Sequence, residues 1–261
     1  MSGYVDIHAH VLPGIDDGPS DLDSALAMLR AAAASGVRTV AATPHLRSDF
    51  PDVHVRELAD RCEQLRQASA RAGIELELVS GAEISVSWAL EASDEDLRLA
   101  SYGQRGHDLL IETPATNILG LDRVLHDLRV KGYRVTLAHP ERNPEFRRND
   151  ATLRGLVQNG VLLQINADSL LGSRASSGPR RFARELCRTG LGHVLASDGH
   201  RAERWRPITV LPAAMGAAAE LVGAERAQWM ASTASAIIDG APVSTPPEVV
   251  SQRRWRLFGR A

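Results

Sequence analysis

Histidine and carboxylate residues occur just past the ends of the short apolar segments of this 261-residue chain. His8 and His10 alternate at the end of the first segment, so both side chains point to the same side of a strand and can chelate one ion. Imidazole and carboxylate ligands together suit Mn, Fe or Zn. The sequence therefore predicts a metal site, and the candidate ligands are His8, His10, Asp17, His45, Glu83, Glu112, His139, Asp198 and His200.

These nine candidates are more than one ion needs, because a single ion uses roughly four to six ligands. Two or three divalent ions are therefore expected. Clustered ions suit the hydrolysis of phosphate esters, since they activate water near neutral pH and hold both the attacking and the leaving oxygen. Arg142 would add a two-pronged grip on phosphate. We expect Arg142 to bind the substrate, and Arg142, Asp198 and His200 to serve in catalysis.

Each of these residues also has an ordinary explanation when it is taken alone. Asp17 belongs to an Asp-Asp-Gly string, which is most often a turn, and Asp198 is a typical helix N-cap residue. Glu83 and Glu112 would be loop or capping carboxylates. The metal-site hypothesis is preferred because all of these coincidences would have to occur at the ends of apolar segments.

Seven apolar segments have the length and composition of buried strands: Tyr4–His8, Thr39–Ala42, Glu75–Ser80, Asp108–Ile111, Arg134–Ala138, Val161–Ile165 and His193–Ala196. Amphipathic helices are predicted between most of them, at Asp21–Ser35, Asp52–Ala72, Ile118–Lys131, Asn149–Asn159 and Pro179–Thr189. Strands that alternate with helices imply parallel βαβ units in an α/β fold. Seven of them indicate a barrel related to the eight-stranded (β/α) type, in which the C-terminal ends of the strands build the active site.

The C-terminal third is more helical, with helices predicted at Ile208–Val222 and Glu225–Asp239. Residues 1–240 are therefore expected to form a single domain. Residues 241–261 contain prolines and several arginines, and they are expected to form an extended basic tail.

Composition argues against several classes of protein. The formal net charge of −2 and the lack of a basic stripe speak against nucleic-acid binding. No apolar run is long enough to span a membrane, and the N-terminus does not resemble a signal peptide. Cys62 and Cys187 provide no disulfide framework, which suits a reducing cytoplasm. Neither cysteine begins a Cys-x5-Arg phosphate loop, so a cysteine nucleophile is not expected.

The candidate ligands lie in longer strings that are spread along nearly the whole chain. These strings are Asp6–Gly18, Ala42–His45, Gly81–Ile84, Leu110–Pro114, Ala138–Asn143 and Ala196–His200. Together they resemble the polymerase and histidinol phosphatase (PHP) superfamily. The resemblance is closest to its bacterial tyrosine-phosphatase branch, which is encoded with capsule and exopolysaccharide genes.

The resemblance implies a distorted (β/α)7 barrel with a trinuclear, manganese-favouring centre held by the nine residues above, with Asp17 rather than Asp16 as the ligand. It also implies that Arg142 contacts the phosphate. The implied substrate is the tyrosine-rich C-terminal tail of a bacterial tyrosine autokinase that controls polysaccharide export. The chain departs from the usual family pattern at Leu46, where many members have a basic residue, and at Thr113, where they have Phe.

We therefore expect a cytoplasmic, metal-dependent protein-tyrosine phosphatase that forms no phosphoenzyme. One alternative is a small-molecule phosphatase, such as one acting on histidinol phosphate. Another is a PHP-like binding module without catalysis, although a decayed site should have lost ligands. The sequence leaves open the metal, the kinase partner, the role of the tail, and whether the chain forms a homo-oligomer.

Overall fold

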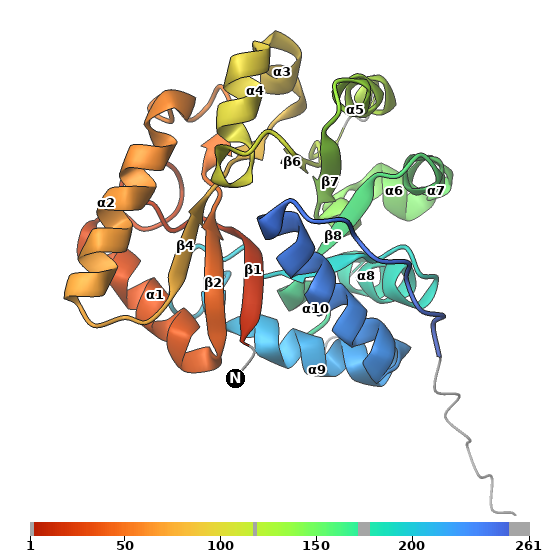
Figure 1. Ribbon diagram of the computed structural model, residues 1–261. Coiled ribbons are helices and arrows are strands. Elements are labelled where there is room, and N and C mark those ends of the chain that lie inside the picture. Colours follow the sequence, from red (N-terminus) through yellow and green to blue (C-terminus); the bar gives the residue numbers. More distant parts are fainter. Residues whose placement is uncertain (1–2, 117–118, 172–177, 251–261) are drawn as a thin grey trace, which may run out of the picture.

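The computed structural model describes residues 3–116, 119–171 and 178–250. Its parallel strands form two sheets that are surrounded by helices (Figure 1). The first sheet has the strand order β1 (Tyr4–Ala9), β2 (Val37–Ala42) and β4 (Glu77–Ser80). The second has the order β3 (His45–Leu46), β5 (Glu83–Ile84), β6 (Asp108–Glu112), β7 (Arg134–Ala138), β8 (Leu162–Asn166) and β9 (Val194–Ala196). The expected α/β class with parallel strand pairing is confirmed.

The two sheets are linked on both sides. Thr43 donates its backbone N–H to the Ala9 carbonyl over 2.9 Å, and Glu83 donates to the Pro44 carbonyl over 3.0 Å, so the pairing of the first sheet continues into the second. On the other side, Ala9 forms an isolated parallel bridge with Gly199, just after β9. Among the described residues the strands form two linked sheets and not one continuous closed sheet.

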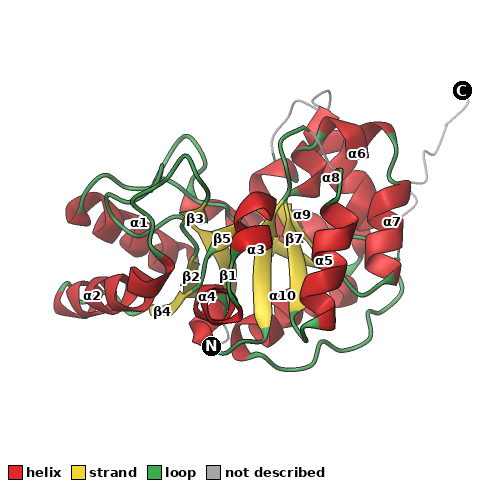
Figure 2. Ribbon diagram, turned by 90° about the horizontal axis from the view of Figure 1, so that it is seen from above, coloured by secondary structure: helices red, strands yellow, loops and turns green. Residues whose placement is uncertain are grey.

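Helices lie around the strands in both ribbon views (Figures 1 and 2). They are α1 (Leu22–Ser35), α2 (Leu58–Arg71), α3 (Val86–Glu91), α4 (Asp94–Ala100), α5 (Leu121–Val130), α6 (Pro144–Arg148), α7 (Ala151–Gln158), α8 (Gly178–Arg188), α9 (Leu211–Val222) and α10 (Ala224–Asp239). The start of α1 is fixed by Asp21, whose side chain accepts a hydrogen bond from the N–H of Ser24. Its end is fixed by Gly36, which has a φ of 102° that favours glycine.

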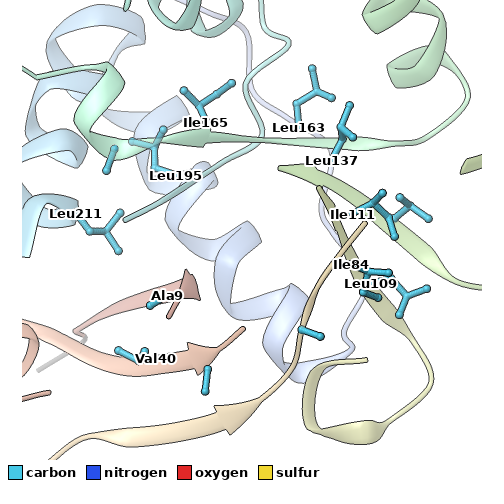
Figure 3. Packing of buried hydrophobic residues seen from close by; sticks show 14 of the residues in the cluster. Ala9, Val40, Ile84, Leu109, Ile111, Leu137, Leu163, Ile165, Leu195 and Leu211 are labelled. Carbon is cyan, nitrogen blue, oxygen red and sulfur yellow. The ribbon is translucent and has the colours of Figure 1, made fainter. Parts of the chain in front are cut away.

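Alternate residues of β8 face two different environments, as the pleat of a strand requires. Leu163 and Ile165 belong to the apolar layer between the strands and the outer helices, and they point away from α10 (Figure 3). Gln164 and Asn166 are also fully buried, but they lie on the other face of the strand. The inner face of β8 therefore carries polar side chains towards its C-terminal end.

Helix α10 packs against β1 and β9. Its residues Ile237 and Ile238 belong to a second apolar cluster, which also contains Ile7 of β1. Arg134, the first residue of β7, donates a hydrogen bond to the Ala236 carbonyl over 2.9 Å. The C-terminal part of α10 thus lies at the strand N-terminal ends, and the opposite ends are left for the polar residues.

The predicted strands agree with the observed ones to within about two residues at each end. Two predicted helices are too long at their N-termini. The helix predicted from Asp52 begins at Leu58 after a short 3-10 turn, and the one predicted from Ile208 begins at Leu211 for the same reason. Apolar spacing continues through a 3-10 turn, so it does not mark the helix start. Ile118, the predicted start of α5, lies outside the described residues.

Several short elements were missed, namely β3, β5, α3, α4 and α6. Helix α3 is capped by Ser85, whose hydroxyl accepts a hydrogen bond from the N–H of Trp88. Helix α4 begins in the same way at Ser93, which caps the N–H of Asp96. Helices this short depend on caps and tertiary packing, because a few residues cannot display a full apolar repeat.

Residues 241–250 have no helix or strand. They are nevertheless fastened to the last helix. The indole N–H of Trp229 donates to the Ser244 carbonyl over 2.9 Å, and the Arg226 guanidinium donates to the Pro247 carbonyl over 3.0 Å. The rest of the predicted tail, residues 251–261, lies outside the described residues. Within the described part of the chain, no helix has the length and apolarity that a membrane span requires.

Candidate metal centre

The nine predicted ligands lie together at the C-terminal ends of the strands and in the segments that follow them. Four overlapping groups bring one ligand atom of each member within 4.8 Å of the others. These groups are His10, Asp17, His45 and His200; His8, His10 and Asp198; His8, Glu83 and His139; and His45, Glu83 and Glu112. Each of the nine residues belongs to at least one group, and several belong to two.

The carboxylate of Glu83 lies at the centre of the cluster and is fully buried. Its Oε2 atom is 2.9 Å from His45 Nδ1, 3.3 Å from His8 Nε2 and 3.4 Å from His10 Nε2. Its Oε1 atom is 2.7 Å from His139 Nε2. The two oxygens therefore face different imidazoles, which is the arrangement that a bridging carboxylate needs.

Two aspartates complete the cluster. The Oδ1 atom of Asp198 is 3.5 Å from His8 Nε2 and 3.6 Å from His10 Nε2. Asp17 lies on the more open side, where its Oδ1 atom is 3.1 Å from His200 Nε2. The Asp17 side chain is 38% exposed, although its Oδ1 atom is buried.

The charges of the cluster are strongly coupled. Burial alone would raise the pKa of Glu83, but the imidazole of His8 and close contacts with the other histidines hold that pKa well below its usual range. Burial lowers the pKa of His200 to about 4, so this imidazole is neutral near pH 7. The pKa values of His8 and His10 rise in spite of burial, because carboxylates beside them favour the imidazolium form. An incoming cation would have to displace these protons.

Several buried ligand atoms make no hydrogen bond among the described residues, although other polar side chains lie close to them. They are Asp17 Oδ1, His45 Nδ1, Glu83 Oε2 and Asp198 Oδ1. Buried polar atoms are almost always hydrogen-bonded, yet these four come from separate segments and belong to the same cluster. A bound cation would satisfy them together, and the mixed imidazole and carboxylate set suits Mn, Fe or Zn. The residues therefore fit a divalent metal centre.

Residues 4–232 match the protein family described as capsular polysaccharide synthesis, CpsB/CapC. The chain belongs to this family. The tyrosine-protein phosphatase YwqE of Bacillus subtilis is 36% identical over 200 residues, which are 75% of this chain and 77% of YwqE. The putative tyrosine-protein phosphatase CapC of Staphylococcus aureus is 30% identical over 197 residues, 75% of this chain and 76% of CapC.

The fold is also similar to a crystal structure of this CpsB/CapC group. The structure comes from work on YwqE from Bacillus subtilis and CpsB from Streptococcus pneumoniae, which are described as metal-dependent tyrosine phosphatases. It superposes with a TM-score of 0.81 at 28% identity, and the match covers 95% of this chain and 100% of the other. The resemblance to the bacterial tyrosine-phosphatase branch is confirmed.

The sixth predicted strand supplies residues that sequence reasoning missed. The Oε1 atom of Gln164 is 3.0 Å from His8 Nδ1, and its amide nitrogen donates to Asn166 Oδ1 over 2.8 Å. The amide nitrogen of Asn166 donates in turn to Asp198 Oδ2 over 2.6 Å. This chain of hydrogen bonds fixes the orientation of two candidate ligands. The sequence did offer a sign of this role, because Gln164 and Asn166 are two amide side chains on the same face of an otherwise apolar strand.

Asp16 orients the centre from the other side. Its Oδ2 atom is 2.7 Å from His10 Nδ1 and accepts a hydrogen bond from the N–H of His45 over 3.2 Å. Its Oδ1 atom accepts from the N–H of Gly18 over 2.9 Å. Asp16 is outside the four groups, whereas Asp17 is inside one of them. This placement agrees with the choice of Asp17 as the candidate ligand.

Three arginines approach the cluster, and only one was predicted. The Nη1 atom of Arg142 is 3.3 Å from Asp198 Oδ2. Arg206 also contacts Asp198, and its Nη1 atom is 2.8 Å from His200 Nε2. Arg47 Nη1 is 2.5 Å from Glu112 Oε1. No spacing rule singles out Arg206, because its position depends on how the loop after β9 folds.

The backbone is constrained at two of the candidate ligands. His139 has a φ of 37° and Asp198 a φ of 51°, both in the left-handed region that favours glycine. Such conformations persist where the surrounding structure enforces them, and they often occur at functional sites. The two unusual backbone conformations therefore occur where the His139 and Asp198 side chains enter the cluster.

Proposed function

We propose that the chain is a metal-dependent protein-tyrosine phosphatase that acts on a tyrosine autokinase of bacterial capsule or exopolysaccharide synthesis. The observation that carries the proposal is the convergence of nine metal-ligand candidates, with buried carboxylate oxygens that make no hydrogen bond, beside the guanidinium groups of Arg142 and Arg206. Cations and guanidinium groups in one place suit a phosphate group. Support also comes from relatives that are named tyrosine-protein phosphatases.

The proposed cofactor is two or three divalent ions, with manganese favoured over Fe or Zn, held by the nine residues of the cluster. When bound, such ions supply a nucleophile at neutral pH and neutralise phosphate charge. Glu83 is the proposed bridging ligand, because both of its oxygens face imidazoles. Elemental analysis of protein purified without chelator is expected to give two or three such ions per chain. One ion or none after metal supplementation would contradict a multinuclear centre.

The residues of the chain itself would bind and orient the phosphate. Arg142 and Arg206 both contact Asp198, so this carboxylate holds the two guanidinium groups beside the cluster. His200 is neutral near pH 7, which suits a ligand rather than a proton donor. A tyrosinate leaving group, with a pKa of about 10, needs less protonation than an alkoxide. The site therefore suits aryl phosphates without a dedicated general acid.

The proposed partner is the phosphotyrosine-containing C-terminal tail of the kinase. The two proteins would interact in the cytoplasm. A tail of this kind is extended, so its phosphotyrosine can enter from the side where Asp17 is partly exposed.

We also infer that the two linked sheets are one distorted (β/α)7 barrel. In this interpretation β2 with β3, and β4 with β5, each count as a single strand. The hydrogen bond from His10 N–H to the Gly199 carbonyl, 2.8 Å long, supports closure between the last strand and the first.

The decisive experiment compares substrates. The wild-type protein, loaded with Mn, is expected to turn over a phosphotyrosyl peptide with a higher kcat/KM than histidinol phosphate, and EDTA should abolish both activities. A preference for histidinol phosphate would favour the small-molecule alternative. Metal binding without any phosphatase activity would favour a binding module.

A further inference from the structure

Trp205 is a large aromatic residue at the edge of the proposed active site. It lies on the loop that connects His200 to Ile208, and 58% of its surface is exposed. Among the described residues it is the only exposed aromatic in the group of large apolar side chains that face solvent. An exposed tryptophan next to a polar site is informative, because aromatic side chains are usually buried or bind ligands.

The indole contacts two residues of the site directly. Its ring centroid is 5.4 Å from that of His200, with the planes at 72°, which is an edge-to-face contact. The guanidinium carbon of Arg206 is 5.4 Å from the indole centroid. Trp205 is therefore adjacent both to a candidate metal ligand and to a guanidinium that would hold the phosphate.

The loop presents Trp205 in a defined position. Arg201 Nη1 donates to the carbonyls of Asp17 and Gly18 over 2.9 and 2.8 Å, which fastens the loop to the segment after β1. Arg204 and Arg206, on either side of Trp205, have φ values of 68° and 50°. Two left-handed residues in one short loop are costly and are kept only where other contacts enforce them. The conformation of the loop therefore keeps the indole of Trp205 exposed.

Phe50 provides an instructive comparison. Its ring stacks on His45 at 5.0 Å with the planes at 11°, and Arg47 lies 5.2 Å from its centroid. Phe50 is half-buried, so its ring is largely used in holding His45. Trp205 differs because more than half of its surface is exposed, although the guanidinium groups of Arg201 and Arg206 lie near its ring.

We propose that Trp205 recognises the aryl ring of the substrate, by stacking against the phosphotyrosine ring while Arg206 holds the phosphate. The inference rests on the proposed function and adds a residue that determines specificity. A phosphate bound beside His200 and Arg206 places its ester oxygen next to the indole, so an attached ring extends along the indole face. An alkyl phosphate has no ring in that position. Trp205 thus favours phosphotyrosine over phosphoserine by binding the ring and not the phosphate.

The test uses the full chain loaded with Mn and the variants Trp205→Ala and Trp205→Phe. Val130→Ala serves as the control, since Val130 is also an exposed apolar residue and lies at the end of α5. Trp205→Ala is expected to raise KM for a phosphotyrosyl peptide about three- to tenfold, the range of an aromatic pair. Competitive inhibition by inorganic phosphate, metal content and melting temperature should stay unchanged. Trp205→Phe should recover most of the lost affinity.

Three results would overturn the inference in distinguishable ways. An unchanged KM in Trp205→Ala would remove the role of the indole alone. Weaker inhibition by inorganic phosphate, in parallel with the higher KM, would show that Trp205 acts by positioning Arg206 and does not recognise the ring. A wild-type protein that cannot turn over the phosphotyrosyl peptide would contradict the proposed function itself, and this inference with it.

Discussion

At the scale of single residues, Glu83 is the carboxylate on which the charge state of the centre depends. It is fully buried, and its low pKa keeps it ionised among four imidazoles from three different segments. A carboxylate can bind two ions through its two oxygens, whereas one imidazole nitrogen binds one. The residue with the most ligand contacts is therefore also the one best suited to join neighbouring ions.

Arg142 is expected to serve the substrate and not the fold. Its guanidinium matches phosphate oxygens in a two-pronged geometry, and a charge-assisted pair contributes about 1.5–3 kcal/mol. Arg142→Ala should therefore lower turnover of a phosphotyrosyl peptide about ten- to a hundredfold. Metal content and melting temperature, measured on the same preparation, should not change.

Arg147 offers a matched control for this variant. Its guanidinium donates to the backbone carbonyls of Glu141 and Arg142, so it supports the loop itself. Arg147→Ala is expected to lower the melting temperature. If Arg142→Ala also lowered the melting temperature, Arg142 would have a structural role. If neither activity nor melting temperature changed, Arg142 would be an ordinary surface residue.

The two cysteines are expected to be irrelevant to catalysis. Both are buried, and burial raises the pKa of Cys62 to about 11 and that of Cys187 to about 12. Their thiols are therefore protonated and inert near pH 7. The double variant Cys62→Ser with Cys187→Ser should keep most of the phosphatase activity, while EDTA should abolish it. Loss of activity in a folded double variant would refute metal-dependent catalysis without a thiol.

At the scale of elements, β8 is expected to tune the metal centre although it carries no candidate ligand. Gln164→Leu removes the hydrogen-bond partner of His8 Nδ1 and breaks the link to Asn166. Loss of such a partner typically weakens metal binding ten- to a hundredfold, and metal titration of the apoprotein would measure it. Gln164→Glu, which keeps an acceptor for His8, should retain more affinity. Equal affinity in Gln164→Leu and wild type would rule out this role.

The elements and the site differ in how far the sequence predicts them. Strand ends were predictable where a buried apolar run stops at polar residues, as at β9, which ends at Ala196 and is followed by Ser197 and Asp198. The short helices α3 and α4 were not, because single serine caps decide them. Arg206 was not predictable either, since its place beside His200 depends on a loop with unusual backbone angles.

At the scale of the whole molecule, His193 links the sheet to the last helix and should make stability depend on pH. Its Nδ1 atom accepts a hydrogen bond from the N–H of Leu163, and its ring lies 5.9 Å from that of Trp229. Burial, together with the charge of Arg226, lowers its pKa from 6.5 to about 4. The folded protein therefore holds this histidine neutral at pH values where the unfolded chain binds a proton.

This difference in proton binding determines how the free energy of unfolding changes with pH. The contribution of His193 to stability is complete above pH 6.5 and is lost as the pH falls towards 4, with a slope of at most about 1.4 kcal/mol per pH unit. His193→Gln should have a shallower decline in the free energy of unfolding over this interval. Denaturant titrations of metal-free protein at several pH values would measure both curves, and parallel curves would count against the assignment.

Helix α10 has a consequence for the synthesis of the chain. Its residues Ile237 and Ile238 share an apolar cluster with Ile7, near the other end of the sequence. On the ribosome every strand is made before this helix emerges, so the inner apolar face of the nascent protein stays open until residues 224–239 have been translated. Helper proteins that shield apolar surface have that interval in which to act. The last helix, which carries none of the candidate ligands, thus sets the moment at which the new chain can finish folding.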